Sequence, residues 1–132
     1  MGDDEACVNA FLNWTAFIWQ LGRKPQTAWV FHGRTGTGKG MLFRVLRALF
    51  GRQALTFSGE LLSDRFNGRL AQAQLLLIDE IDSDQIDKGS LAAKLRSWIT
   101  EETLPLRGMR VEAAEIPSFF GVILASNNRL NV

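Results

Sequence analysis

Residues 33–40 combine four glycines and one lysine with the spacing of a phosphate-binding loop. Glycine lets the backbone adopt conformations that other residues avoid, so successive N–H groups can turn inward toward one anion. Lys39 adds an ammonium that would contact the β and γ phosphates of a nucleotide. The residues predicted to bind the nucleotide are Gly33, Arg34, Thr35, Gly36, Thr37, Gly38, Lys39, Gly40 and Met41.

Two flanking elements must position this loop. Residues 28–31 are apolar, as in a buried strand, and residues 41–50 have helical periodicity. Strand, glycine loop and helix is the order that a phosphate-binding loop requires. The helix contributes the positive end of its dipole to the site.

The residues after Lys39 depart from the usual pattern. A Ser or Thr is expected there because its hydroxyl binds Mg²⁺, but the sequence continues with Gly40 and Met41. Mg²⁺ would then be held by a distant carboxylate, by water and by the nucleotide itself.

A pair of carboxylates ends a second apolar segment, residues 75–78. Such a continuous apolar run is typical of a parallel strand buried on both faces, and ligands gather at the carboxyl ends of these strands. Asp79 is therefore predicted to bind Mg²⁺ near Lys39, and Glu80 to orient and deprotonate the water that attacks the γ phosphate. The alternative is a solvated strand end.

A third apolar segment, residues 119–125, is followed by Ser126 and Asn127. An amide at the same edge can bridge a water and the γ phosphate, so we predict this role for Asn127. The alternative is that the asparagine only forms a turn.

A hairpin is predicted at residues 103–111, with Gly108 at its tip. Arg107 and Arg110 flank the tip and are predicted to contact phosphates of nucleic acid. Solvated surface charges are the alternative interpretation of these two arginines. A short strand at residues 54–57 and a helix at residues 91–100 are also predicted.

An apolar helix is predicted before the loop, from Glu5 to Leu21, with Asp4 placed to cap it and Gly22 to end it. Apolar residues surround most of its circumference, so we expect the helix to be buried. It would pack beneath the sheet of this domain, or else face a partner or a missing segment.

Length and composition fit one folded domain of 132 residues. The formal charge is +1, so binding to nucleic acid must be local. The single cysteine excludes a disulfide framework, and no apolar run approaches the roughly 20 residues of a membrane span. We therefore expect a soluble, cytoplasmic protein.

This ordered set of motifs resembles superfamily 3 helicases, and more narrowly the primase-helicase domains of phages and plasmids. The resemblance implies an α/β fold, a P-loop NTPase of AAA+-like type with three layers, a mostly parallel sheet, a preceding apolar helix and an inserted β-hairpin. By resemblance Lys39 is the Walker A lysine, Asp79 and Glu80 are the Walker B pair, and Asn127 is the sensor asparagine. A glycine after the loop lysine also occurs in that group, so Gly40 agrees with the resemblance. Met109 departs from it, because relatives usually carry a lysine at or near this position.

The resemblance further implies a function in DNA replication in a bacterial or phage-infected cell. The chain would be the motor core of a helicase that uses ATP and Mg²⁺ to move on single-stranded DNA, in a ring that is commonly a hexamer. In such rings a neighbour's arginine, which follows the sensor in sequence, reaches the nucleotide, and Arg129 is the only basic residue after Asn127 here. We therefore expect residues 1–132 to be a single P-loop ATPase core, either the central part of a longer primase-helicase or a shortened relative. The alternatives are a nucleotide kinase and a nucleotide-dependent binding or assembly module with little turnover.

Overall fold

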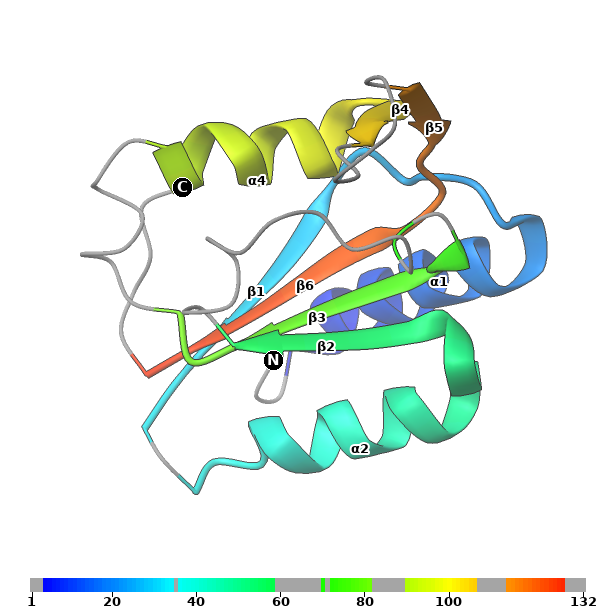
Figure 1. Ribbon diagram of the computed structural model, residues 1–132. Coiled ribbons are helices and arrows are strands. Elements are labelled where there is room, and N and C mark those ends of the chain that lie inside the picture. Colours follow the sequence, from blue (N-terminus) through cyan, green and yellow to red (C-terminus); the bar gives the residue numbers. More distant parts are fainter. Residues whose placement is uncertain are drawn as a thin grey trace.

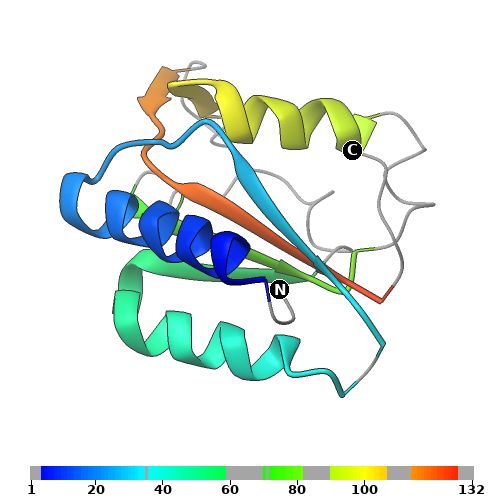
Figure 2. The ribbon, with the colours of Figure 1, turned by 180° about the vertical axis from the view of Figure 1, so that it is seen from behind.

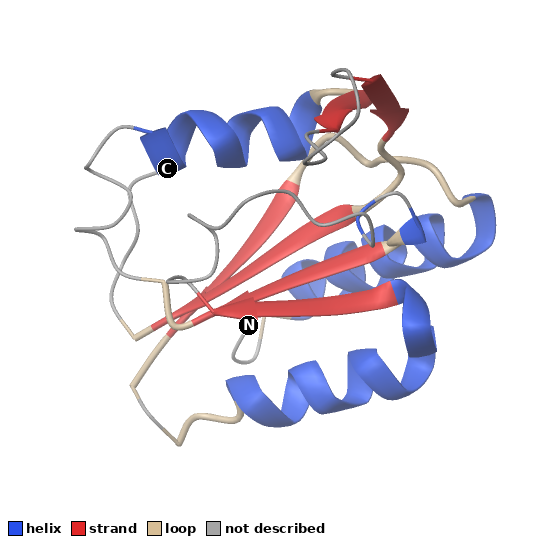
Figure 3. Ribbon diagram, in the orientation of Figure 1, coloured by secondary structure: helices blue, strands red, loops and turns tan. Residues whose placement is uncertain are grey.

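The computed structural model describes residues 4–34, 36–58, 70, 72–81, 90–106 and 114–127 (Figure 1). Figure 3 colours the same view by secondary structure. The elements in chain order are α1 (Glu5–Leu21), β1 (Ala28–His32), α2 (Lys39–Phe50), the 3₁₀ turn η1 (Gly51–Gln53), β2 (Ala54–Ser58), β3 (Leu75–Asp79), α4 (Ser90–Thr100), β4 (Thr103–Leu106), β5 (Ala114–Pro117) and β6 (Gly121–Ser126).

Four strands form one parallel sheet in the order β1-β6-β3-β2. The inner strands β3 and β6 are the two long apolar runs of the sequence, and Leu75–Ile78 and Gly121–Ser126 are buried. Strands that are covered on both faces need apolar side chains at every position rather than at alternate ones. The predicted α/β fold with a parallel sheet is therefore confirmed.

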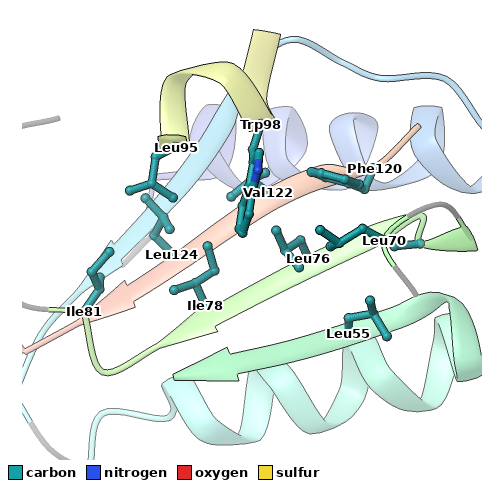
Figure 4. Close-up of a cluster of buried hydrophobic side chains, with 11 residues drawn as sticks. Leu55, Leu70, Leu76, Ile78, Ile81, Leu95, Trp98, Phe120, Val122 and Leu124 are labelled. Atoms are coloured by element: carbon teal, nitrogen blue, oxygen red, sulfur yellow. The ribbon is translucent and has the colours of Figure 1, made fainter. Parts of the chain in front are cut away.

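Helices cover both faces of the sheet: α1 and α2 lie side by side on one face, and α4 lies on the other (Figures 1 and 2). Because successive residues of a strand point to opposite faces, β3 and β6 supply both cores. Leu76, Ile78, Val122 and Leu124 belong to the cluster with Leu95 and Trp98 of α4 (Figure 4). The other cluster joins Leu75, Leu77, Ile123 and Ala125 with Phe11, Trp14 and Ile18 of α1 and Phe43, Leu46 and Phe50 of α2.

Helix α1 has the bounds that its capping residues predict. Asp4 accepts a hydrogen bond from the Cys7 N–H at 3.1 Å, and Gly22 ends the helix in a left-handed conformation. The helix packs on the sheet, which confirms one of the two predicted locations. The prediction that apolar residues all around α1 are buried is wrong, because the sheet covers only one side of the helix. Leu12 is 56% exposed and Trp19 is 50% exposed.

Two other strand boundaries differ from those predicted. Strand β6 begins at Gly121, two residues after the expected start, and β5 pairs antiparallel with β4 from Ala114 to Pro117 instead of at residues 109–111. The segment Ala114–Pro117 has no strand signature of its own, so pairing with β4 decides its conformation. The predicted tip of the hairpin lies outside the described residues.

Lys24, in the turn before β1, ties that turn to the α4 side of the sheet. Its ammonium lies 4.2 Å from the centre of the Phe120 ring and donates a hydrogen bond to the Trp98 carbonyl near the end of α4. Burial lowers the pKa of Lys24 to about 8, and the negative charge of Glu101 acts in the opposite direction. The turn that leads into β1 is thus anchored to both the core and a helix end.

Within the described part of the chain, every helix is too short or too polar to cross a membrane.

Strand β6 and helix α1 meet at Gly121, where the approach leaves no room for a side chain. A Cβ atom there would lie 2.8 Å from the indole ring of Trp14 and still closer to the Ile18 side chain. The start of β6 can therefore pack this closely on α1 only because Gly121 has no side chain.

We predict that Gly121→Ala lowers the free energy of unfolding by about 1–3 kcal/mol, the usual cost of overpacking a filled core. Gly40→Ala is the matched control, because a Cβ at this helical position meets no atom within 4 Å. The control should be neutral or stabilising by up to ~1 kcal/mol. Urea denaturation measures both variants, and equal stability of the Gly121 variant and the parent would contradict this packing.

Candidate functional site

The carboxyl ends of the parallel strands bring the predicted site residues to one edge of the sheet. His32 at the end of β1 pairs with Ser126 at the end of β6, and Ser58 at the end of β2 pairs with Asp79 at the end of β3. The glycine loop follows β1 directly. The loop, the carboxylate pair and Asn127 therefore share this edge, at the lower left of the sheet in Figure 1.

The glycine loop uses conformations that glycine tolerates best. Gly36 and Gly38 have φ values of 88° and 97°, and the second of them is the N-cap of α2. The first turn of α2 contains no acidic residue, and the cap makes no side-chain hydrogen bond to the helix. The first N–H groups of α2 and the positive end of its dipole thus lack a negative partner within that turn.

Short contacts hold the loop around a compact turn. The Thr37 hydroxyl donates to the Arg34 carbonyl at 2.9 Å, and the Gly33 N–H donates to the Ser126 carbonyl at 3.2 Å. A Cβ on Gly33 would lie 3.0 Å from the Thr37 hydroxyl oxygen, which is tighter than an ordinary contact. The loop is therefore fixed at its start to the neighbouring strand β6.

Lys39 lies at the centre of these contacts. Its ammonium donates to the carbonyls of Gly33 and Arg34, the latter at 3.3 Å, and to the side-chain oxygen of Asn127 at 3.2 Å. Lys39 and Asn127 are 88 positions apart in the sequence, so only the parallel arrangement of β1 and β6 brings them together. All three acceptors are neutral oxygens, which leaves the positive charge of Lys39 uncompensated by them.

Asp79 and Glu80 follow β3 at the same edge of the sheet as Lys39, and neither carboxylate makes a hydrogen bond to its ammonium. Asp79 accepts the Glu80 N–H at 2.9 Å, and the next residue, Ile81, is buried and donates its N–H to the Ala125 carbonyl at 3.3 Å. Asp79 is half-buried and Glu80 is exposed. Among the described residues, Lys39 bonds to Asn127 and to neither carboxylate.

Glu80 has a strained backbone, with φ at 56°. A non-glycine residue in the left-handed region costs of order 1–3 kcal/mol, and such residues concentrate at functional sites. Here the strain follows from the anchors on both sides, since Asp79 belongs to the sheet and Ile81 is buried in the core. Nothing in the sequence Asp79-Glu80-Ile81 indicates this turn, and sequence reasoning missed it.

A Mg²⁺ ion at this edge would depend on few protein ligands. Within the described ranges, no three His, Cys, Asp or Glu side chains gather into one group. Mg²⁺ commonly keeps several waters and binds through one or two carboxylates together with substrate phosphates. Asp79 at the strand end fits that mode of binding, and a site built from protein side chains alone does not.

Three predicted binding residues cannot be placed in this geometry. Thr35 of the glycine loop and both hairpin arginines, Arg107 and Arg110, lie outside the described residues. Met41, in the first turn of α2, is 60% exposed. Gly40, directly after Lys39, occupies the position where a metal-binding hydroxyl is usual.

Comparison with known proteins gives the family. Residues 31–132 match DUF5906, a family of unknown function. The chain belongs to this family. It is also 31% identical over 131 residues to the DNA primase-polymerase of Nitratiruptor phage NrS-1, an alignment that covers 98% of this chain and 18% of that protein.

Solved structures of the NrS-1 C-terminal region share the fold. One apo structure superposes with a TM-score of 0.85 at 28% identity and covers 98% of this chain and 32% of the other. A second, in the A form, has a TM-score of 0.79 at 30% identity and covers 93% and 29%. The DUF5906 chain is therefore homologous to part of a phage replication protein and spans less than a third of each of these structures.

These relatives contradict the predicted function. The homologue is a DNA primase-polymerase, so the prediction of an ATP-driven helicase motor is wrong. The part of the resemblance that the homologue supports is the broader link to phage DNA replication. The physical reason is that a glycine loop with a lysine indicates chemistry with phosphates, which many activities share. The coupling to movement on DNA rested on the resemblance to helicases alone.

We predict that Glu80→Gly raises the free energy of unfolding by about 1 kcal/mol, because glycine adopts this positive φ without the steric cost that other residues carry. Glu80→Gln is the matched control, since it removes the charge but keeps the strained backbone. The control should unfold at the same urea concentration as the parent. Destabilisation by the glycine variant would show that the turn at residue 80 is not strained.

Proposed function

We propose that the carboxyl edge of the sheet binds the triphosphate of a nucleoside triphosphate, with ATP as the first candidate, together with Mg²⁺. The observation that carries this proposal is the position of Lys39. Its ammonium lies between the glycine loop and Asn127, at the N-terminus of α2. A cation and a helix N-terminus that act on one point favour a multiply charged anion.

The contacts of Lys39 support an exchange of acceptors. The ammonium is held by carbonyl and amide oxygens, whereas a phosphate oxygen carries negative charge and makes a stronger, charge-assisted hydrogen bond. Binding of a triphosphate would therefore move Lys39 from the carbonyls of Gly33 and Arg34 to the β and γ phosphates. Asn127 would stay near the terminal phosphate.

The carboxylate pair has two further proposed roles. Asp79 would hold Mg²⁺, directly or through water, and Glu80 would orient a water molecule beside the terminal phosphate. The sheet order and the loop between β1 and α2 support a P-loop NTPase type of fold under this proposal.

The relatives suggest the setting in which such a site works. Because NrS-1 encodes a DNA primase-polymerase, we propose that this chain is the nucleotide-binding part of a longer DNA replication protein, with DNA as its partner. The contact of Arg107 and Arg110 with DNA, and assembly into a ring, stay predictions.

We predict that Lys39→Met weakens binding of Mg²⁺-ATP by roughly 10- to 100-fold, because it removes hydrogen bonds from a charged donor, worth about 1.5–3 kcal/mol. Isothermal titration calorimetry on the full chain measures the affinity. Arg44→Met is the matched control: it removes an exposed positive charge from the same helix, five residues on, and should bind as the parent does. Unchanged affinity in the Lys39 variant would contradict the proposed site.

A further inference from the structure

Two adjoining hollows lie at the opposite, amino edge of the sheet. One has a volume of about 460 Å³ and the other about 500 Å³, and both are lined by Arg52 and Gln72. The larger hollow is also lined by Gly22, Gln53, Gln74 and Phe119. Because they share two lining residues, the hollows are neighbours, and we call the pair the amino-edge trough.

Backbone hydrogen bonds fix the floor of the trough. The Gln74 N–H donates to the Gln53 carbonyl at 2.8 Å, and the Gly121 N–H donates to the Gln74 carbonyl at 3.0 Å. These bonds connect the beginnings of β2, β3 and β6, where the sheet is held from both faces. The backbone along the trough is thus held by the sheet, which favours a preformed ligand site.

The side chains of the trough combine one cation with neutral hydrogen-bonding groups. Arg52 contributes a guanidinium, and Gln53, Gln72 and Gln74 contribute amides that can both donate and accept. Within the described part of the chain, Arg52 has no ion pair, and the described lining includes no acidic residue. An anionic ligand would therefore meet attraction from Arg52 without repulsion from these lining residues.

An exposed aromatic ring completes the trough. Phe119 is 46% exposed, although the adjacent Phe120 is fully buried in the core. The backbone at Phe119 is therefore anchored by its neighbour while the ring stays accessible. An exposed ring beside a guanidinium and amides matches the three parts of a nucleotide: a base that stacks, a phosphate that pairs with arginine, and base edges that bond to amides.

We propose that the amino-edge trough binds single-stranded DNA. Arg52 would contact a backbone phosphate, Phe119 would stack on a base, and the glutamine amides would bond to base edges. Each hollow lies within the roughly 300–1,000 Å³ of small-molecule sites. Two neighbouring hollows that share Arg52 in their linings fit consecutive nucleotides of a strand better than one free nucleotide.

The trough is independent of the proposed triphosphate site. The two lie at opposite ends of strands of five or six residues, which places them about 16 Å apart at ~3.3 Å per residue. A strand in the trough would therefore leave the glycine loop accessible. No residue of one site belongs to the other.

We predict that Arg52→Glu weakens binding of a fluorescently labelled 15-nucleotide oligothymidylate at least about tenfold and lowers the salt dependence by ~0.7 in slope, the value for one phosphate of a single strand. Phe119→Leu keeps an apolar side chain but loses the stacking surface, so it should weaken binding about fivefold or more. Fluorescence anisotropy on the full chain at low salt measures both. Thermal melting should be the same in both variants as in the parent.

Arg44→Glu is the matched control, because it makes the same change of charge on α2 outside the trough. It should bind the oligonucleotide within about twofold of the parent. Equal losses in the Arg44 and Arg52 variants, no binding by the parent, or equally tight binding of thymidine 5′-monophosphate would each overturn the proposal. Lys39→Met should keep oligonucleotide binding, so failure of the triphosphate site is distinguishable from failure of the trough.

Discussion

Burial of β6 between β1 and β3 is the constraint on which the rest of the structure depends. All six residues of β6 are buried, so the last strand in sequence must lie in the middle of the sheet, parallel to its neighbours. This order places the end of β6 beside the end of β1 and brings Asn127 to Lys39. A different order of strands would separate these two side chains, and the glycine loop would have no polar neighbour across the edge.

The same constraint gives the sheet two chemically different edges. The carboxyl edge carries an ammonium, a helix N-terminus and two carboxylates that make no hydrogen bond to the ammonium. At the amino edge, a guanidinium lies among amides and an exposed ring. Each edge carries a cation that would attract phosphate. The carboxyl edge also carries carboxylates, as binding of Mg²⁺ with a triphosphate requires, whereas the described lining of the amino-edge trough includes none. The two edges are therefore suited to different phosphate-bearing ligands.

The parts of the fold that local chemistry decides were predictable from the sequence. Asp4 and Gly22 delimit α1 through capping, and the apolar run before Asp79 identifies a buried parallel strand. The exposure of Trp19 was not predictable, because it depends on which side of α1 meets the sheet. The strand at Ala114–Pro117 depends on its pairing with β4 in the same way.

For the candidate site, the sequence indicated which side chains share an edge but not how they bond. The parallel order predicts that Asp79 and Asn127 end near the glycine loop, whereas the positive φ of Glu80 follows from tertiary anchors that no local pattern records. The amino-edge trough escaped prediction because Arg52, Gln72 and Phe119 come from three separate segments. Function was predictable only as far as phosphate chemistry, and homology to a primase-polymerase then excluded the helicase motor.

The most direct test of the central claim is a titration of the ¹⁵N-labelled full chain with Mg²⁺-ATP, followed through backbone and side-chain amide signals by NMR. We predict that the largest shifts fall on Gly36, Gly38, Lys39 and the side-chain amide of Asn127, while Arg52 and Gln72 stay unchanged. Shifts that are absent from the glycine loop, or that gather at the amino edge instead, would show that the triphosphate does not bind at the carboxyl edge.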